Sequence, residues 1–202
     1  MIAKQEAGVM DTKRIAFVAL MGALGNILFA FSSYLGPIIP GVSTDLSHIP
    51  TFIAAIYGGP MMGFVTGLVV GILPGIQYGP LSPFGSWIAV VALPVGKSLT
   101  GLTSGLIYSV LKGNQRKRKS LFTIPVVLAA YVPECLFTVF YFVALLPYLV
   151  GSGGASILMF ILPKAWAEIV FISFFMAALV GNDGFNSFVA HFFNTRSAAP
   201  QP

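Results

Sequence analysis

Long apolar runs, separated by turn-forming glycines and prolines, constrain the fold of this chain more than any other feature. Several runs reach about 20 residues, which is the length a helix needs to cross the roughly 30 Å hydrocarbon core of a bilayer. Hydrophobic residues make up 56% of the 202 residues and charged residues 8%, whereas an average soluble domain is about 25% charged. The sequence therefore predicts an all-α integral membrane protein that forms one compact bundle.

We expect six transmembrane helices, two of which are separated by the turn signal Gly58-Gly59-Pro60. Proline suits the first turn of a helix, and a Gly-Gly-Pro run favours a turn before it. A single span over 49–76 would also place the basic cluster 116–119 outside the cell, against the positive-inside rule. The predicted helices cover approximately residues 15–35, 47–57, 60–76, 86–112, 121–148 and 156–180. The second is only about 16 Å long and is too short to cross alone.

Basic residues at one side of the predicted bundle set its orientation. Lys13 and Arg14 precede the first helix, and the cluster 116–119 lies in a short connector, so both termini are expected in the cytoplasm. The first apolar run is longer than the roughly 7–15 residues of a signal-peptide core, so we interpret it as a retained helix. Residues 1–12 then form a cytoplasmic segment, 13–180 the membrane domain and 181–202 a cytoplasmic tail whose last residues are expected to be disordered.

The same distribution of charge bears on partners. The net charge of +5 comes mostly from the short connector, and such a basic connector is typical of a cytoplasmic loop. We therefore expect the chain to contact the lipid bilayer and not to bind nucleic acid. Cys135 is the single cysteine, which excludes an intrachain disulfide framework.

Four charged residues interrupt the apolar runs, namely Lys97, Glu134, Lys164 and Glu168. A charge at bilayer depth costs roughly 2.5–3.5 kcal/mol on insertion scales, so it needs a partner, a cavity or a substrate. Helix geometry places all four in the middle or outer half of the bundle. One interpretation is two neutralising pairs, Lys97 with Glu134 and Lys164 with Glu168. The other is a pocket that opens outward and binds a polar solute, and the two are compatible.

Neighbouring residues are candidates for the wall and entrance of such a pocket. Aromatic and polar side chains suit a planar solute, and the candidates are Asn26, Tyr131, Thr138 and Trp166. The outer connections 36–46, 77–85 and 149–155 are rich in glycine, proline or serine. Asp45, Gln77 and Tyr78 of these connections, with His48 at the start of the second helix, are candidate gate residues, although Asp45 or Ser47 also suits a helix N-cap.

Small residues recur along two helices. Gly63, Gly67, Gly71 and Gly75 share one face of the third helix, which predicts close packing against another helix of the chain, with self-dimerisation as the alternative. Ala16, Ala19 and Ala23 form a similar patch on the first helix. This alanine patch either packs inside the bundle or meets another subunit.

Motifs for enzyme chemistry are mostly lacking. Gly96-Lys97-Ser98 resembles the end of a P-loop, but Val91 occupies the position of its first glycine. His48 and His191 fall on opposite sides of the predicted topology, so no metal centre or cofactor is expected. The alternatives to a transport protein are a membrane-embedded enzyme that uses the two carboxylates and an oligomeric channel built on the glycines of the third helix.

The chain resembles the substrate-binding S-components of energy-coupling factor (ECF) vitamin transporters. The resemblance covers most of residues 13–180 and is carried by the alanine-patterned first helix (19-ALMGA-23), by 44-TDLSHIP-50 and by 57-YGGPMMG-63.

This resemblance implies a protein that binds a vitamin or related small molecule from outside with high affinity. It implies a membrane T-component and two ATPase subunits as partners, with no ATP hydrolysis by the chain itself. The first helix would be the docking face, with Ala19 and Ala23 in the interface. The binding site would use helices four to six and the outer loops, where Lys97, Glu134 and the other intramembrane charges lie. No complete signature for one vitamin is present.

Overall fold

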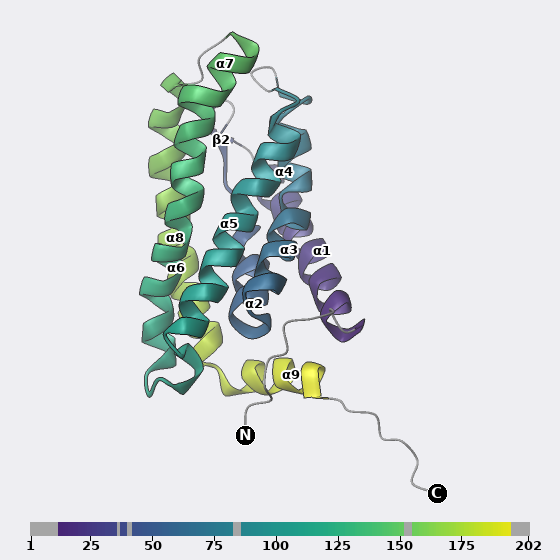
Figure 1. The fold of residues 1–202 in the computed structure, drawn as a ribbon, viewed down its shortest axis with the longest axis vertical. Coiled ribbons are helices and arrows are strands. Elements are labelled where there is room, and N and C mark those ends of the chain that lie inside the picture. The colour runs from purple at the N-terminus through teal and green to yellow at the C-terminus, as the bar shows by residue number, and fades with distance from the viewer. Residues whose placement is uncertain (1–11, 36, 40–41, 83–85, 152–154, 195–202) are drawn as a thin grey trace, which may run out of the picture.

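A helical membrane bundle forms the body of the molecule (Figure 1). The computed structural model describes residues 12–35, 37–39, 42–82, 86–151 and 155–194. Within them, five stretches are long and apolar enough to cross a membrane. They are α1 (Thr12–Tyr34), α3 with α4 (Pro60–Val70 and Ile72–Tyr78), α5 (Ala89–Val110), α6 continued through η2 and α7 (Lys119–Phe140, Tyr141–Leu145 and Leu146–Val150), and α8 (Ala155–Gly181).

The remaining elements are short. α2 (His48–Gly58) has 11 residues and lies inside the bundle, which agrees with the expected short second helix. It is preceded by the antiparallel strand pair β1 (Pro37–Ile39) and β2 (Val42–Ser43). A 3-10 turn, η1 (Gly113–Gln115), lies in the basic connector. The turn between α2 and α3 uses Gly59 at φ 90°, a backbone conformation that favours glycine.

The long helix near residue 140 is interrupted by η2, a π-helical turn. Pro147 follows it and has no N–H with which to continue an α-helical ladder. The predicted helix 121–148 is thus present as three consecutive segments. The predicted helices 60–76, 86–112 and 156–180 are also present, with ends that differ by a few residues.

The glycine face of α3 and α4 packs within the chain, as expected. A methyl group added at Gly63 would overlap the carbonyl oxygen of Gly101, and one added at Gly67 would overlap that of Lys97. Such contacts require glycine on α3, because a side chain at these positions would hold the two helix axes apart. The glycines are therefore used to fix α5, which carries Lys97, against α3.

The two faces of α1 differ in their surroundings. Gly22 and Gly25 are buried, and each contacts a valine of α3 (Val69 and Val70). Ala16, Ala19 and Ala23 are exposed on the other side of the helix. Among the described residues, the alanine patch thus faces outward and is not a packing face of the bundle.

A helix that the sequence analysis did not anticipate, α9 (Asp183–Asn194), lies across one end of the bundle (Figure 1). Its ring partners are Phe17 of α1, which meets Phe192 and Phe193, and Tyr57 of α2, which meets Phe185. The Tyr57 hydroxyl donates to Asn186 Oδ1 at 2.7 Å. α9 therefore joins α1 and α2 at this end. The predicted disordered residues at the C-terminus lie outside the described residues.

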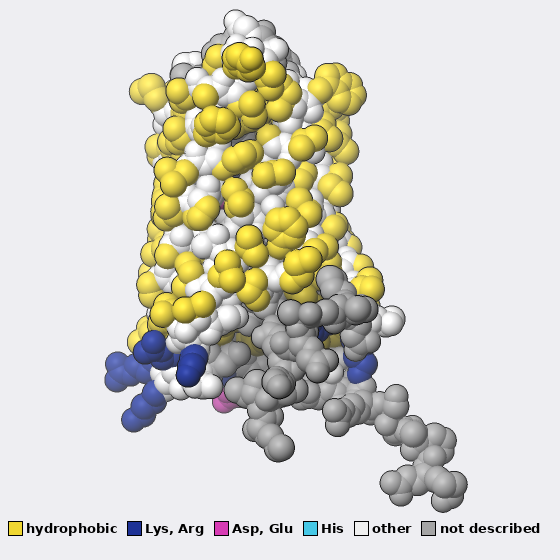
Figure 2. Space-filling view, in the orientation of Figure 1, with side chains coloured by type: hydrophobic (Ala, Val, Ile, Leu, Met, Phe, Trp, Pro, Cys, Tyr) yellow, Lys and Arg dark blue, Asp and Glu magenta, His cyan; other side chains and the backbone are white. Residues whose placement is uncertain are grey.

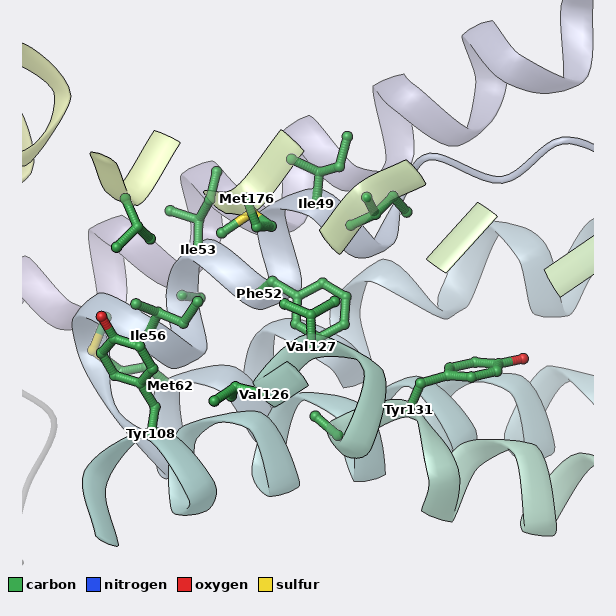
Figure 3. Close-up of a cluster of buried hydrophobic side chains, with 14 of the residues drawn as sticks. Ile49, Phe52, Ile53, Ile56, Met62, Tyr108, Val126, Val127, Tyr131 and Met176 are labelled. Carbon is green, nitrogen blue, oxygen red and sulfur yellow. The ribbon is translucent and has the colours of Figure 1, made fainter. Parts of the chain in front are cut away.

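The molecule has one basic end and one apolar flank. Figure 2 shows lysine and arginine side chains gathered at the end that carries α9 and the connector 111–118, with hydrophobic side chains along the flank. Inside the half nearer this end, α2, α6 and α8 enclose an apolar core (Figure 3). Its members include Phe52, Ile56, Val127, Ile172 and Met176, all buried. This half of the bundle is closed by packed side chains.

Candidate functional site

A cavity of about 190 Å³ lies in the other half of the bundle. One water needs roughly 10–15 Å³ of such space, so the cavity has room for a small organic molecule. α5, α6, η2 and α8 supply most of its wall, and the segment before α2 and the end of α4 complete it. The lining residues are Asp45, His48, Tyr78, Ser82, Ala89, Ala92, Leu93, Gly96, Lys97, Tyr131, Glu134, Phe137, Thr138, Tyr141, Phe142, Leu146, Ile157, Ile161, Lys164, Ala165, Glu168 and Ile169.

Lys97 is at the centre of the polar part of this wall. It is 3% exposed, and its ammonium lies 2.7 Å from Asp45 Oδ2, 2.9 Å from Ser47 Oγ and 3.3 Å from His48 Nδ1. Three acceptors match the three N–H groups of an ammonium. Ser47 in turn donates its backbone N–H and its hydroxyl to Asp45 Oδ1. The lysine thus ties α5 to the segment before α2.

His48 lies between Lys97 and Glu134. Its Nε2 is 3.1 Å and 3.0 Å from the two carboxylate oxygens of Glu134, and Thr100 Oγ1 also donates to that carboxylate. The predicted pair of Lys97 with Glu134 is therefore wrong. Lys97 pairs with Asp45. The imidazole of His48, the first residue of α2, lies between α5 and α6 and contacts both Lys97 and Glu134.

The second predicted pair is confirmed. Lys164 and Glu168, one turn apart on α8, are 2.9 Å apart. Glu168 Oε1 also accepts the backbone N–H of Asp45 at 2.8 Å. The segment before α2 is therefore held from two sides, by Lys97 of α5 and by Glu168 of α8.

Asp45 is an ionisable group of this network and lies in the segment before α2, outside the membrane-spanning helices. Burial by itself would raise its pKa, but the charges of Lys97 and His48 and the bonds from Lys97 and Ser47 outweigh burial and hold the pKa below its usual range. Asp45 is thus ionised at neutral pH and forms a charged pair with Lys97. As for the predicted N-cap, Ser47 occupies that position of α2 but makes no side-chain capping bond.

The rest of the cavity wall is apolar and aromatic. Ala89 and Ala92 of α5 pack near Tyr141 and Leu146, with Phe137 and Phe142 beside them. Alanines at these positions leave space that larger side chains would fill. Sequence analysis did not select these residues, because single apolar residues in an apolar run carry no signal of their own.

Two of the predicted wall residues, Tyr131 and Thr138, do line the cavity. Trp166 lies behind Tyr131, with ring centroids 5.3 Å apart in an edge-to-face arrangement, and is not among the lining residues. It supports the wall through Tyr131.

Asn26 has a different role from the predicted one. Its amide donates to the carbonyls of Gly22 and Val69 and accepts from Leu73 N–H, so it fastens α1 to α3 and α4. It is not a lining residue, and the prediction that it contacts substrate is not supported.

The predicted gate residues are likewise only partly brought together. Asp45, His48 and Tyr78 line the cavity, whereas Gln77 does not. Within the described residues, no group of three or more histidine, cysteine, aspartate or glutamate side chains has an arrangement suited to a metal ion. The site has hydrogen-bonding groups at one side of the cavity and apolar surface at the other, which is the arrangement of a small-molecule binding site.

A multi-helix membrane bundle with a charge-lined cavity in one half and a packed core in the other defines a membrane protein that binds a small solute. Comparison with known proteins gives the family. Residues 13–180 match the model of the ECF transporter substrate-specific component, and the chain belongs to this family. It is a multi-pass protein of the cell membrane.

Among curated proteins, the chain is similar to the riboflavin transporter RibU of Staphylococcus aureus (strain TCH60). The two are 27% identical over 147 residues, which cover 71% of each chain. No solved structure matches.

Proposed function

We propose that this protein binds a vitamin-like small molecule in the cavity and delivers it across the cell membrane. It would do so as the substrate-specific component of an ECF-type importer, with ATP hydrolysed by partner subunits. The observation that carries the proposal is the cavity itself, which has lysine, aspartate and glutamate side chains from three helices and one loop on its wall and packed side chains beneath it. Intramembrane charges of this kind mark substrate sites.

The proposed direction of entry follows from where the cavity lies. The ends of α4 and α8 that contribute Tyr78 and Ile157 are opposite the basic end. By the positive-inside rule the basic end is cytoplasmic. The solute therefore enters from outside.

The proposed contact with the membrane T-component is the alanine patch on α1. Ala16, Ala19 and Ala23 are exposed, whereas the glycines of the same helix are used inside the bundle. Small residues on a membrane-facing surface allow another helix to approach closely.

The alternatives of an enzyme or a channel have less support. The glycines on which a channel would be built are occupied by α5. The two carboxylates that would serve an enzyme are each bonded to neighbouring groups, Glu134 to His48 and Thr100, and Glu168 to Lys164 and Asp45 N–H.

The direct test is to identify what the protein carries. The purified protein is denatured, its small molecules are extracted, and they are identified by mass spectrometry; ligand-free protein is then titrated with the compound found and with riboflavin, the cargo named for the similar transporter. We expect one vitamin-like compound in near-stoichiometric amount with submicromolar affinity. Protein that is folded, carries no compound and binds none of the water-soluble vitamins would contradict the proposal.

A further inference from the structure

We propose that the basic connector 111–118, between α5 and α6, binds the phosphate headgroups of anionic phospholipids in the cytoplasmic leaflet. This connector belongs to the basic end of the molecule, and the cavity lies in the other half of the bundle. The proposal therefore goes beyond the solute and its delivery. It rests on the charge of the connector, on its ordered backbone and on the apolar side chains that flank it.

The charge of the connector is not neutralised within the described residues. Lys119 is the first residue of α6, and it is preceded by the four exposed cations of the connector, namely Lys112, Arg116, Lys117 and Arg118. The sequence has no aspartate or glutamate between residues 46 and 133. Among the described carboxylates, Asp183 of α9 is the one outside the cavity wall, and neither it nor any of these cations belongs to an ion pair of the described residues. A phosphate can therefore bind here without competing with a carboxylate of the chain.

The backbone of the connector is ordered by local contacts. The N–H of Gln115 donates to the carbonyl of Lys112 at 2.9 Å and closes a turn. The Arg116 guanidinium lies 5.0 Å from the centroid of the Phe122 ring, and its Nε donates to the carbonyl of Leu111 at 3.3 Å. These contacts hold the guanidinium in place and leave its terminal N–H groups without an acceptor among the described residues. Paired N–H groups of this kind match the oxygens of a phosphate.

Apolar side chains border the cations on the membrane side. Val110 and Leu111 at the end of α5 are 74% and 42% exposed, and Leu121 in the first turn of α6 is 59% exposed. Figure 2 shows the same order, with lysine and arginine side chains beyond a flank of hydrophobic ones. A phospholipid joins a phosphate to acyl chains and so matches both surfaces at once, whereas a soluble anion uses the cations alone. Anionic lipids attract basic segments next to a membrane helix, so we assign a lipid as the occupant.

The experiment compares two lipids that differ in headgroup charge. Purified protein in detergent is titrated with phosphatidylglycerol or with phosphatidylcholine of the same acyl chains, and bound lipid is counted by native mass spectrometry. We expect phosphatidylglycerol to bind at least tenfold more tightly, because it carries the net negative charge that the connector attracts. Equal binding of the two lipids would overturn the proposal. A hundredfold excess of glycerophosphoglycerol, the same headgroup without acyl chains, should not displace the lipid, and displacement would assign the site to soluble phosphates instead.

Two variants that remove equal charge locate the site. Lys117→Gln with Arg118→Gln changes the connector, whereas Lys13→Gln with Arg14→Gln changes the start of α1 at the same basic end. The connector variant should lose at least fivefold of the preference for phosphatidylglycerol, and the α1 variant less than twofold. Equal losses would mean a diffuse basic surface, and a full preference in the connector variant would mean that another surface binds the lipid; either result overturns the proposal.

A measurement on wild-type protein keeps the test decisive if a variant does not fold. Raising the salt concentration from 50 to 500 mM should lower the preference for phosphatidylglycerol at least fivefold, because exposed charges are screened by salt. A preference that does not change with salt would overturn the proposal. Solute affinity of both folded variants should equal that of the wild type, so the outcome for the lipid is independent of the proposed function.

Discussion

At the scale of single residues, the two intramembrane lysines are in unlike settings. The Lys97 side chain is 4% exposed and has three acceptors, whereas the Lys164 side chain is 17% exposed and is paired along its own helix. Breaking a buried pair leaves a charge without compensation, and the cost is about 3–5 kcal/mol. A pair one turn apart on a more open helix is worth less.

Lys97→Met is therefore expected to lower both stability and affinity, with a loss of about 3 kcal/mol in the free energy of unfolding. Lys164→Met should weaken ligand binding with a smaller loss of stability. Thermal unfolding and ligand titration of both variants measure the two effects. Asp45→Asn in the Lys97→Met background should restore part of the stability, since it removes the orphaned carboxylate. Unchanged affinity in both lysine variants would make these charges structural pairs and not part of the binding site.

The sequence was sufficient to find the charged residues but not to pair them. Charges inside apolar runs stand out, and helix geometry alone placed Lys97 and Glu134 at one height. The actual partners of Lys97 are Asp45, Ser47 and His48, about 50 residues away in the chain, and those of Glu134 are His48 and Thr100. The path of the segment before α2 depends on how α2 packs between α5 and α8, and no local pattern encodes such packing. Only Lys164 with Glu168, one turn apart, was predictable from spacing.

At the scale of helices, the sequence likewise predicted some elements and missed others. The long apolar helices and the short α2 were predictable from apolar length and from the Gly-Gly-Pro turn. α9 was missed because a search for apolar runs passes over amphipathic segments. Its signal was present: Phe185, Val189, Phe192 and Phe193 recur at helical spacing, and Asn182 accepts from Phe185 N–H as an N-cap at 2.8 Å.

The division of α1 into a glycine face and an alanine face leads to a test of docking. Ala19→Leu combined with Ala23→Leu adds bulk only to the exposed face, so ligand binding should be unchanged while uptake into cells falls at least tenfold. Ala167→Leu is the matched control, because Ala167 is exposed on α8, away from α1, and its change should leave uptake normal. The measurements are ligand affinity of purified protein and uptake of radiolabelled ligand.

Two results would contradict this assignment. Normal uptake by the double variant would exclude α1 as the docking face. Loss of ligand binding with normal assembly of the transporter would mean that the exposed face of α1 affects the cavity and not the partner.

At the scale of the whole molecule, the bundle has two halves with different content. The half nearer the basic end is filled by the core around Phe52, Val127 and Met176, and the other half contains the cavity. Lys97, His48 and Asp45 lie where the two halves meet and hold α2 and its preceding segment in place. The central claim is that the solute is bound in this cavity.

The most direct test fills the cavity without changing its charges. Ala92 is 5% exposed and lines the cavity, so Ala92→Phe places a ring in the space proposed for the solute, whereas Ala167→Phe places the same ring on the outside of α8. The measurement is the amount of co-purified ligand and the affinity for added ligand in both folded variants. We expect Ala92→Phe to carry no ligand and to bind at least a hundredfold more weakly, with Ala167→Phe equal to wild type. Full ligand content and unchanged affinity in Ala92→Phe would contradict the claim that this cavity is the binding site.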